Sequence, residues 1–98
     1  MTINIEKENG VILLKIEGRL DTTTAPELEK TINNEGVELK NLVLDFKGVD
    51  YISSAGLRVL LTAQKKMNLQ GSMELVNVSE AVMDIFEMTG FADILEIE

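Results

Sequence analysis

The chain has 98 residues, of which 45% are hydrophobic and 27% charged, so it suffices for one domain with a modest core and is too apolar to remain disordered. It contains no cysteine and no histidine, which excludes disulfides, thiolate or histidine metal sites, and nucleophiles activated by histidine. Its net charge of −8 opposes binding to nucleic acid or to an anionic membrane surface.

No segment of the sequence has the pattern of a membrane span or a secretion signal. The apolar runs fall far short of the roughly 20 residues that cross a bilayer, and residues 1–5 lack a basic start and an apolar signal core. The sequence has no phosphate loop of P-loop type and no pairing of acids with a nucleophile that indicates hydrolysis. We therefore expect one cytoplasmic domain, residues 1–98, that works without a cofactor or metal and is not an enzyme.

The first third of the chain predicts a hairpin followed by a helix. Residues 2–8 and 11–17 read as strands, and Asn9-Gly10 between them is the strongest hairpin signal in the sequence. Threonines at 22–24, with a proline in the following turn, predict a helix start. Residues 33–36, which include two asparagines and a glycine, predict the end of that helix.

The middle of the chain predicts a buried strand. The consecutive apolar residues Leu42, Val43 and Leu44 indicate a strand over about 41–46 that is central in the sheet and buried on both faces. Val43 and Leu44 are therefore expected among the most buried residues.

The remaining elements complete an α/β fold. A helix is predicted over about 54–69, a strand over 73–76, a helix between Ser79 and Gly90, and a last short strand over 94–97. The order β-β-α-β-α-β-α-β demands a mixed β-sheet of four to five strands with helical crossovers, because parallel neighbours cannot be joined by tight turns.

The adjacent hydroxyls of Ser53 and Ser54 are the main candidates for function, because they lie at a strand-to-helix turn. Either serine suits the position before the first helical turn, where a side-chain oxygen accepts from a free backbone N–H group. A modifiable hydroxyl there lies at the positive end of the helix dipole, where added negative charge is tolerated. Gly56 in the first turn has two explanations, close packing against the sheet or close approach by a partner's backbone.

Asp21 is a second candidate. It ends the run Gly18-Arg19-Leu20-Asp21, where the chain leaves the second predicted strand. On residue type alone, a loop aspartate most simply accepts hydrogen bonds from local N–H groups. An exposed acid in this place also suits a partner surface.

Taken together, these residues resemble the anti-sigma-factor antagonist family, the free-standing bacterial members of the STAS domain. The resemblance covers nearly the whole chain and includes residues 18–21, 42–46, 53–57 and 79–91. It implies a partner switch in which the unmodified protein binds an anti-sigma factor that is also a serine kinase, and so frees a sigma factor. Phosphorylation of one serine at the start of the second helix breaks the complex, and a protein serine phosphatase is the further partner implied.

In the family pattern this turn reads Asp-Ser-Ser-Gly-Leu, and the serine two before the glycine accepts the phosphate. Counting back from Gly56 gives Ser54 as the phosphorylation site, with Ser53 as the alternative. This chain has Ser53 where the pattern has aspartate and Ala55 where it has the second serine. The resemblance, with Asp21 placed near the second helix, implies a partner-binding set of six residues: Asp21, Arg19, Ser53, Ala55, Gly56 and Arg58.

Two other functions stay open at this point. One is a non-catalytic scaffold or signalling subunit of a larger STAS complex, in which the serines only cap a helix. The other is a small phosphate or nucleotide binder that uses the helix N-terminus as an anion site. The scarcity of basic residues near Ser54, with Arg58 and Arg19 the only candidates, argues against the second.

Overall fold

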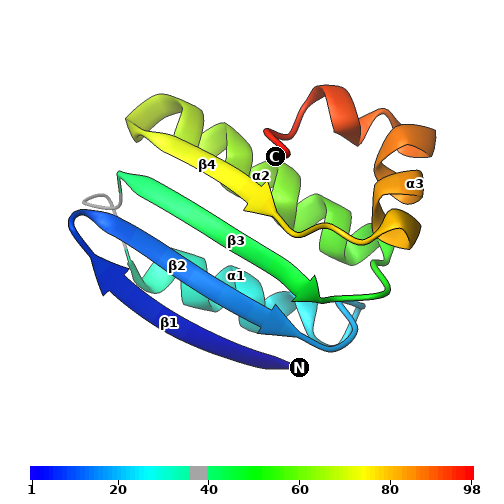
Figure 1. Cartoon of the computed structure of the whole chain (residues 1–98), viewed down its shortest axis with the longest axis horizontal. Coiled ribbons are helices and arrows are strands. Elements are labelled where there is room, and N and C mark those ends of the chain that lie inside the picture. Colours follow the sequence, from blue (N-terminus) through cyan, green and yellow to red (C-terminus); the bar gives the residue numbers. More distant parts are fainter. Residues whose placement is uncertain (36–39) are drawn as a thin grey trace.

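The computed structural model describes residues 1–35 and 40–98 and shows helices packed on a four-stranded sheet (Figure 1). The strands lie across the sheet in chain order: β1 (Thr2–Glu8), β2 (Val11–Glu17), β3 (Asn41–Gly48) and β4 (Ser72–Val76). β1 and β2 are antiparallel, whereas β3 is parallel to both β2 and β4. The predicted mixed sheet is therefore confirmed. Within the described ranges, no helix is long and apolar enough to cross a membrane.

The predicted hairpin joins β1 to β2. Asn9 and Gly10 both have positive φ angles, 52° and 81°, as a two-residue turn of type I′ requires. The turn sets the register, in which Glu8 pairs with Val11 and Ile5 with Leu14.

Two helices cover the same face of the sheet (Figure 1). α1 (Ala25–Asn34) joins β2 to β3, and α2 (Ser54–Gln70) joins β3 to β4. Pro26 lies in the first turn of α1, as predicted. The predicted end of this helix is only partly described, because Gly36 lies outside the described residues.

The burial of β3 differs from the prediction. The strand is central, and Leu42, Leu44 and Phe46 on one face are buried. Val43, on the opposite face, is only half-buried. The expectation of burial on both faces is wrong because α1 and α2 lie on the same side, and within the described residues no helix covers the other.

The C-terminal third contains a helix and a short irregular segment. In α3 (Glu80–Thr89) the Ser79 hydroxyl accepts from the Val82 N–H at 3.2 Å, and Gly90 ends the helix with a φ of 82°, both as predicted. A 3₁₀ turn, η2 (Phe91–Asp93), follows.

The last predicted strand is wrong. The chain over 94–97 is not a strand, and it meets β4 in an isolated parallel bridge between Leu75 and Ile97. Two backbone hydrogen bonds of 2.9 Å, between Leu75 and residues Glu96 and Glu98, hold this bridge. The observed order is therefore β-β-α-β-α-β-α.

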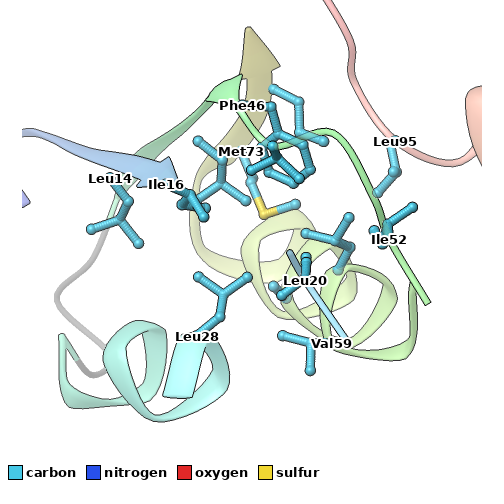
Figure 2. Packing of buried hydrophobic residues seen from close by; sticks show 14 of the residues in the cluster. Leu14, Ile16, Leu20, Leu28, Phe46, Ile52, Val59, Met73 and Leu95 are labelled. Carbon is cyan, nitrogen blue, oxygen red and sulfur yellow. The ribbon is translucent and has the colours of Figure 1, made fainter. Parts of the chain in front are cut away.

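The core lies between the sheet and the two crossover helices (Figure 2). Leu14, Phe46 and Met73 enter it from the strands, and Leu28 enters from α1; all four are fully buried. Two further members, Leu20 and Ile52, belong to loops that follow β2 and β3. Burial of these side chains fixes both loops against the end of the sheet.

Candidate functional site: the start of helix α2

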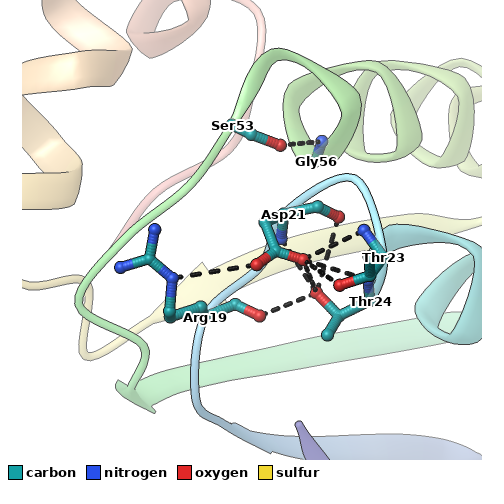
Figure 3. Close-up of polar contacts among 6 residues, drawn as sticks. All are labelled: Arg19, Asp21, Thr23, Thr24, Ser53 and Gly56. Carbon is teal, nitrogen blue, oxygen red and sulfur yellow. Dashed lines mark hydrogen bonds and ion pairs between the residues drawn. The ribbon is translucent and has the colours of Figure 1, made fainter.

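Two loops are joined side by side beyond the ends of β2 and β3. The Leu20 N–H donates to the Tyr51 carbonyl at 3.0 Å, and the Ser53 N–H donates to the Leu20 carbonyl at 2.9 Å. These bonds form a parallel bridge between Leu20 and Ile52. The loop that contains Asp21 therefore lies beside the start of α2, as expected (Figure 3).

Gly56 is the contact point between the two loops and the helix. It is buried, and a Cβ atom there would lie 2.8 Å from both the Leu20 Cγ and the Ile52 Cγ1. Such a separation is shorter than real Cβ contacts, so a side chain would push the loop away from α2. The structure thus shows close packing at Gly56, but against the loop residues Leu20 and Ile52 and not against the sheet as predicted.

The two serines have different environments. Ser53 is extended, with φ −98° and ψ 174°, and its Oγ accepts from the Gly56 N–H at 3.3 Å, so it is the N-cap of α2. Ser54 is the first helical residue and is exposed, and its hydroxyl makes no hydrogen bond with the described residues. The cap and the accessible hydroxyl therefore belong to different residues.

Asp21 organises the turn that leads into α1 (Figure 3). Its Oδ1 accepts from the Thr23 hydroxyl at 2.8 Å, the Thr23 N–H at 3.0 Å and the Thr24 N–H at 3.1 Å. The hydrogen bond from the Thr23 hydroxyl is the main cause that holds the pKa of the Asp21 carboxyl below its usual range, and the two N–H groups add to it. Burial acts on this pKa in the opposite direction but is outweighed. The local hydrogen-bonding role expected from residue type is therefore present.

Arg19 is held in place by two neighbours. Its guanidinium lies 4.0 Å from the centroid of the Tyr51 ring, a cation–π distance, and its Nε lies 3.7 Å from the Asp21 Oδ2. Tyr51 itself is 37% exposed. Arg19 is thus occupied in the loop, which weakens its candidacy as an anion ligand for the start of α2.

Arg58 lies one turn after Ser54, on the same face of α2. It is exposed and forms no ion pair with the described residues. Ala55, between Ser54 and Gly56, is half-buried. Five of the six predicted partner residues thus gather where the two loops meet α2, and Arg58 follows one turn along the helix.

Sequence reasoning missed Tyr51 as a member of this surface. The signal was an aromatic residue directly before the buried Ile52 and the two serines. Its contact with Arg19 depends on the pairing of the two loops, which no local pattern indicates.

Comparison with known proteins identifies the family of this fold and site. The model of the STAS domain matches residues 2–98. The anti-sigma-B factor antagonist of Bacillus subtilis is 30% identical over 98 residues, which cover 99% of this chain and 90% of that protein. The chain therefore belongs to the STAS domain family, in the group of the anti-sigma factor antagonists.

Solved structures show the same fold. An anti-sigma factor antagonist from Mycobacterium paratuberculosis superposes with a TM-score of 0.85 at 26% identity, covering 98% of this chain and 83% of that chain. The Bacillus cell fate determinant SpoIIAA, solved in a phosphorylated form, has a TM-score of 0.75 at 15% identity, with 99% of this chain and 91% of that chain covered. At 15% identity the likeness to SpoIIAA concerns the fold alone.

Proposed function

We propose that the unmodified chain binds an anti-sigma factor that is also a serine kinase, and that phosphorylation of Ser54 ends this binding. A protein serine phosphatase then restores the binding form. The observation that carries the proposal is the Ser54 hydroxyl, which is exposed at the first residue of α2 and has no partner among the described residues. The antagonist relative from Bacillus subtilis supports the class of partner.

A phosphate on Ser54 is compatible with the folded chain. It adds roughly −1.5 to −2 charges at the end of α2 where backbone N–H groups point outward. The first turn of α2 contains no acidic residue that would repel it, and Arg58 lies one turn further on the same face. The phosphate therefore acts on the partner, which must oppose or desolvate the new charge when it docks.

Docking itself falls to the surface around the two joined loops. Arg19 and Tyr51 are the residue types that most often dominate binding energy, and their contact fixes both side chains before a partner arrives. Asp21 shapes the adjoining loop and adds one carboxylate to the rim. The chain acts by binding alone, in the cytoplasm, where a sigma factor is controlled, and it needs no cofactor, membrane or nucleic acid.

The test uses purified anti-sigma kinase with ATP, and mass spectrometry to locate the phosphate. Ser54→Ala should abolish phosphorylation, and Ser53→Ala, the matched control one residue away, should retain it. Calorimetric titration should show that Ser54→Asp binds the unmodified kinase at least about tenfold more weakly than the parent, with a melting temperature at least as high as the parent's. Phosphate on Ser53 in the parent chain, or parental affinity for Ser54→Asp, would contradict the proposal.

A further inference from the structure

The negative charge of the protein is concentrated in its last third. Residues 67–98 contain no lysine or arginine, and their acids account for all but one unit of the net charge of −8. The seven acidic residues are Glu74, Glu80, Asp84, Glu87, Asp93, Glu96 and Glu98. This part of the chain comprises the end of α2, β4, α3 and η2, and three of the seven acids lie on α3.

The outer surface of α3 carries two parallel stripes. Glu80, Asp84 and Glu87 recur at i, i+4 and i+7, are exposed, and form no ion pair with the described residues. Beside them, at the same spacing, lies the apolar stripe of Ala81, Ile85 and Met88.

The apolar stripe is accessible. Met88 is 85% exposed, Ala81 is exposed and Ile85 is half-buried. The buried residues of α3 are Val82 and Phe86, and the half-buried Met83 and Ile85 also pack against the core. Helix α3 therefore has a partly exposed apolar stripe, in which Met88 and Ala81 face solvent, with carboxylates along one side.

The negative charge of this face determines which kind of partner can bind it. A second copy of the chain would bring carboxylates against carboxylates, and an anionic membrane would be repelled in the same way. The carboxylates do not converge on a metal site, since the described residues contain no group of three or more metal-ligating acids. A partner helix with basic residues beside an apolar row can pair with the acidic stripe and pack on the apolar stripe at the same time. The flexible Met88 side chain adapts readily to such a partner.

We propose that the exposed face of α3 (Glu80, Ala81, Asp84, Ile85, Glu87 and Met88) binds a basic amphipathic helix of a partner protein. α3 lies at the end of the sheet where α2 begins (Figure 1), and its exposed face does not include Ser54. The proposal goes beyond the phosphorylation switch and does not depend on it.

The test is an NMR titration of the labelled chain with a synthetic 18-residue helix that has leucines on one face and lysines on the other. Amide signals of residues 80–88 should shift most. Met88→Ser, which leaves the charge unchanged, should weaken binding about fivefold, as loss of a central apolar contact does. Asp84→Asn with Glu87→Gln should also weaken it and reduce its salt dependence.

Matched controls separate this site from general attraction of a cationic peptide. Leu69→Ser removes another exposed apolar residue, 91% exposed on α2, and should leave the affinity unchanged. Glu27→Gln with Glu29→Gln on α1 makes the same charge change as the α3 pair and should weaken binding less. Amide spectra of each variant report whether it is folded. Shifts centred outside α3, parental affinity of Met88→Ser, or equal loss in Leu69→Ser would overturn the proposal.

Discussion

The starts of α2 and α3 are built alike and differ at one informative position. Each begins with a serine cap whose hydroxyl accepts from the N–H three residues later, at 3.3 Å for Ser53 and 3.2 Å for Ser79. The first helical residue is then Ser54 in α2 and Glu80 in α3. α3 thus carries a permanent negative charge where α2 carries an exposed hydroxyl. The comparison shows that a serine-capped helix of this chain carries an anion at its first residue, beside the positive end of the helix dipole.

The third helical residue marks the other difference between the two starts. It is Val82 in α3, whose side chain is buried in the core, and Gly56 in α2, where Leu20 and Ile52 occupy the space that a side chain would need. α2 therefore begins against two core residues that belong to loops, whereas α3 begins with a side chain of its own in the core.

The largest effect is expected from Gly56→Ala. Alanine normally favours a helix interior by about 1 kcal/mol over glycine, but here the new Cβ would meet Leu20 and Ile52 at 2.8 Å. We expect a loss of about 1–3 kcal/mol in the free energy of unfolding, measured with urea. Thr62→Ala, at an exposed position of the same helix, is the control and should be neutral or slightly stabilising. A stabilised Gly56→Ala would mean that the loop retreats from α2 at no cost.

The two serine caps should contribute about equally to the free energy of unfolding. Ser53→Ala and Ser79→Ala should each lower the free energy of unfolding by about 0.5–2 kcal/mol, because each leaves a helix N–H without its acceptor. Ser54→Ala should change it by less than about 0.5 kcal/mol, as an exposed side chain without a hydrogen bond. Thermal and urea unfolding measure all three, and a Ser54→Ala loss as large as that of Ser53→Ala would show that the cap is shared.

A negative charge at the first helical residue should stabilise both helices by a smaller amount, so adding one to α2 and removing one from α3 should change the free energy of unfolding in opposite directions. Ser54→Glu reproduces in α2 what Glu80 provides in α3, and should raise stability by about 0.3–1 kcal/mol at low ionic strength. Glu80→Gln should lower stability by a similar amount. Both differences should shrink in about 1 M salt, where screening acts over about 3 Å. A destabilised Ser54→Glu would show that phosphate at this position disturbs the fold as well as the partner.

The smallest effect on stability is expected from Glu74, an acid that lies in a strand and not at the start of a helix. Burial, followed by the carboxylates of Glu98 and Glu96, raises the pKa of Glu74 above its ordinary value. The protonated form is therefore favoured in the folded state, so stability falls as the pH rises above about 4.3, the ordinary glutamate value. Glu74→Gln should remove this fall and stabilise the chain at pH 7 by a few tenths of a kcal/mol, of the order of one cross-strand charge pair. Melting temperatures of parent and variant between pH 4 and 7 should diverge as the pH rises, and parallel curves would contradict the assignment.

Locally encoded features could be predicted from the sequence. The Asn9-Gly10 turn and the start and end of α3 depend on residues within a few positions of one another, so their patterns suffice. Val43 and the segment 94–97 could not be predicted, because their burial and pairing depend on where other elements pack.

The site shows the same limit. Residue types alone did not decide between Ser53 and Ser54 as the cap of α2. The deciding contact is the bond from the Ser53 N–H to the Leu20 carbonyl, which holds Ser53 extended and starts the helix at the next residue. The position of Asp21 near α2 was predicted through family resemblance, whereas its hydrogen bonds to Thr23 and Thr24 follow the ordinary chemistry of a loop aspartate.

The bridge between Leu20 and Ile52 also constrains when the surface can exist during folding. Its two residues are separated by all of α1 and β3, so the contact forms only after that whole crossover has closed, at a cost in loop entropy. A chain with an incomplete β2-α1-β3 unit has Ser54 but lacks the neighbouring loop that holds Arg19 and Asp21 beside it. The proposed binding surface is therefore completed late in folding, and a partner that requires both loops would distinguish fully folded molecules from incomplete ones.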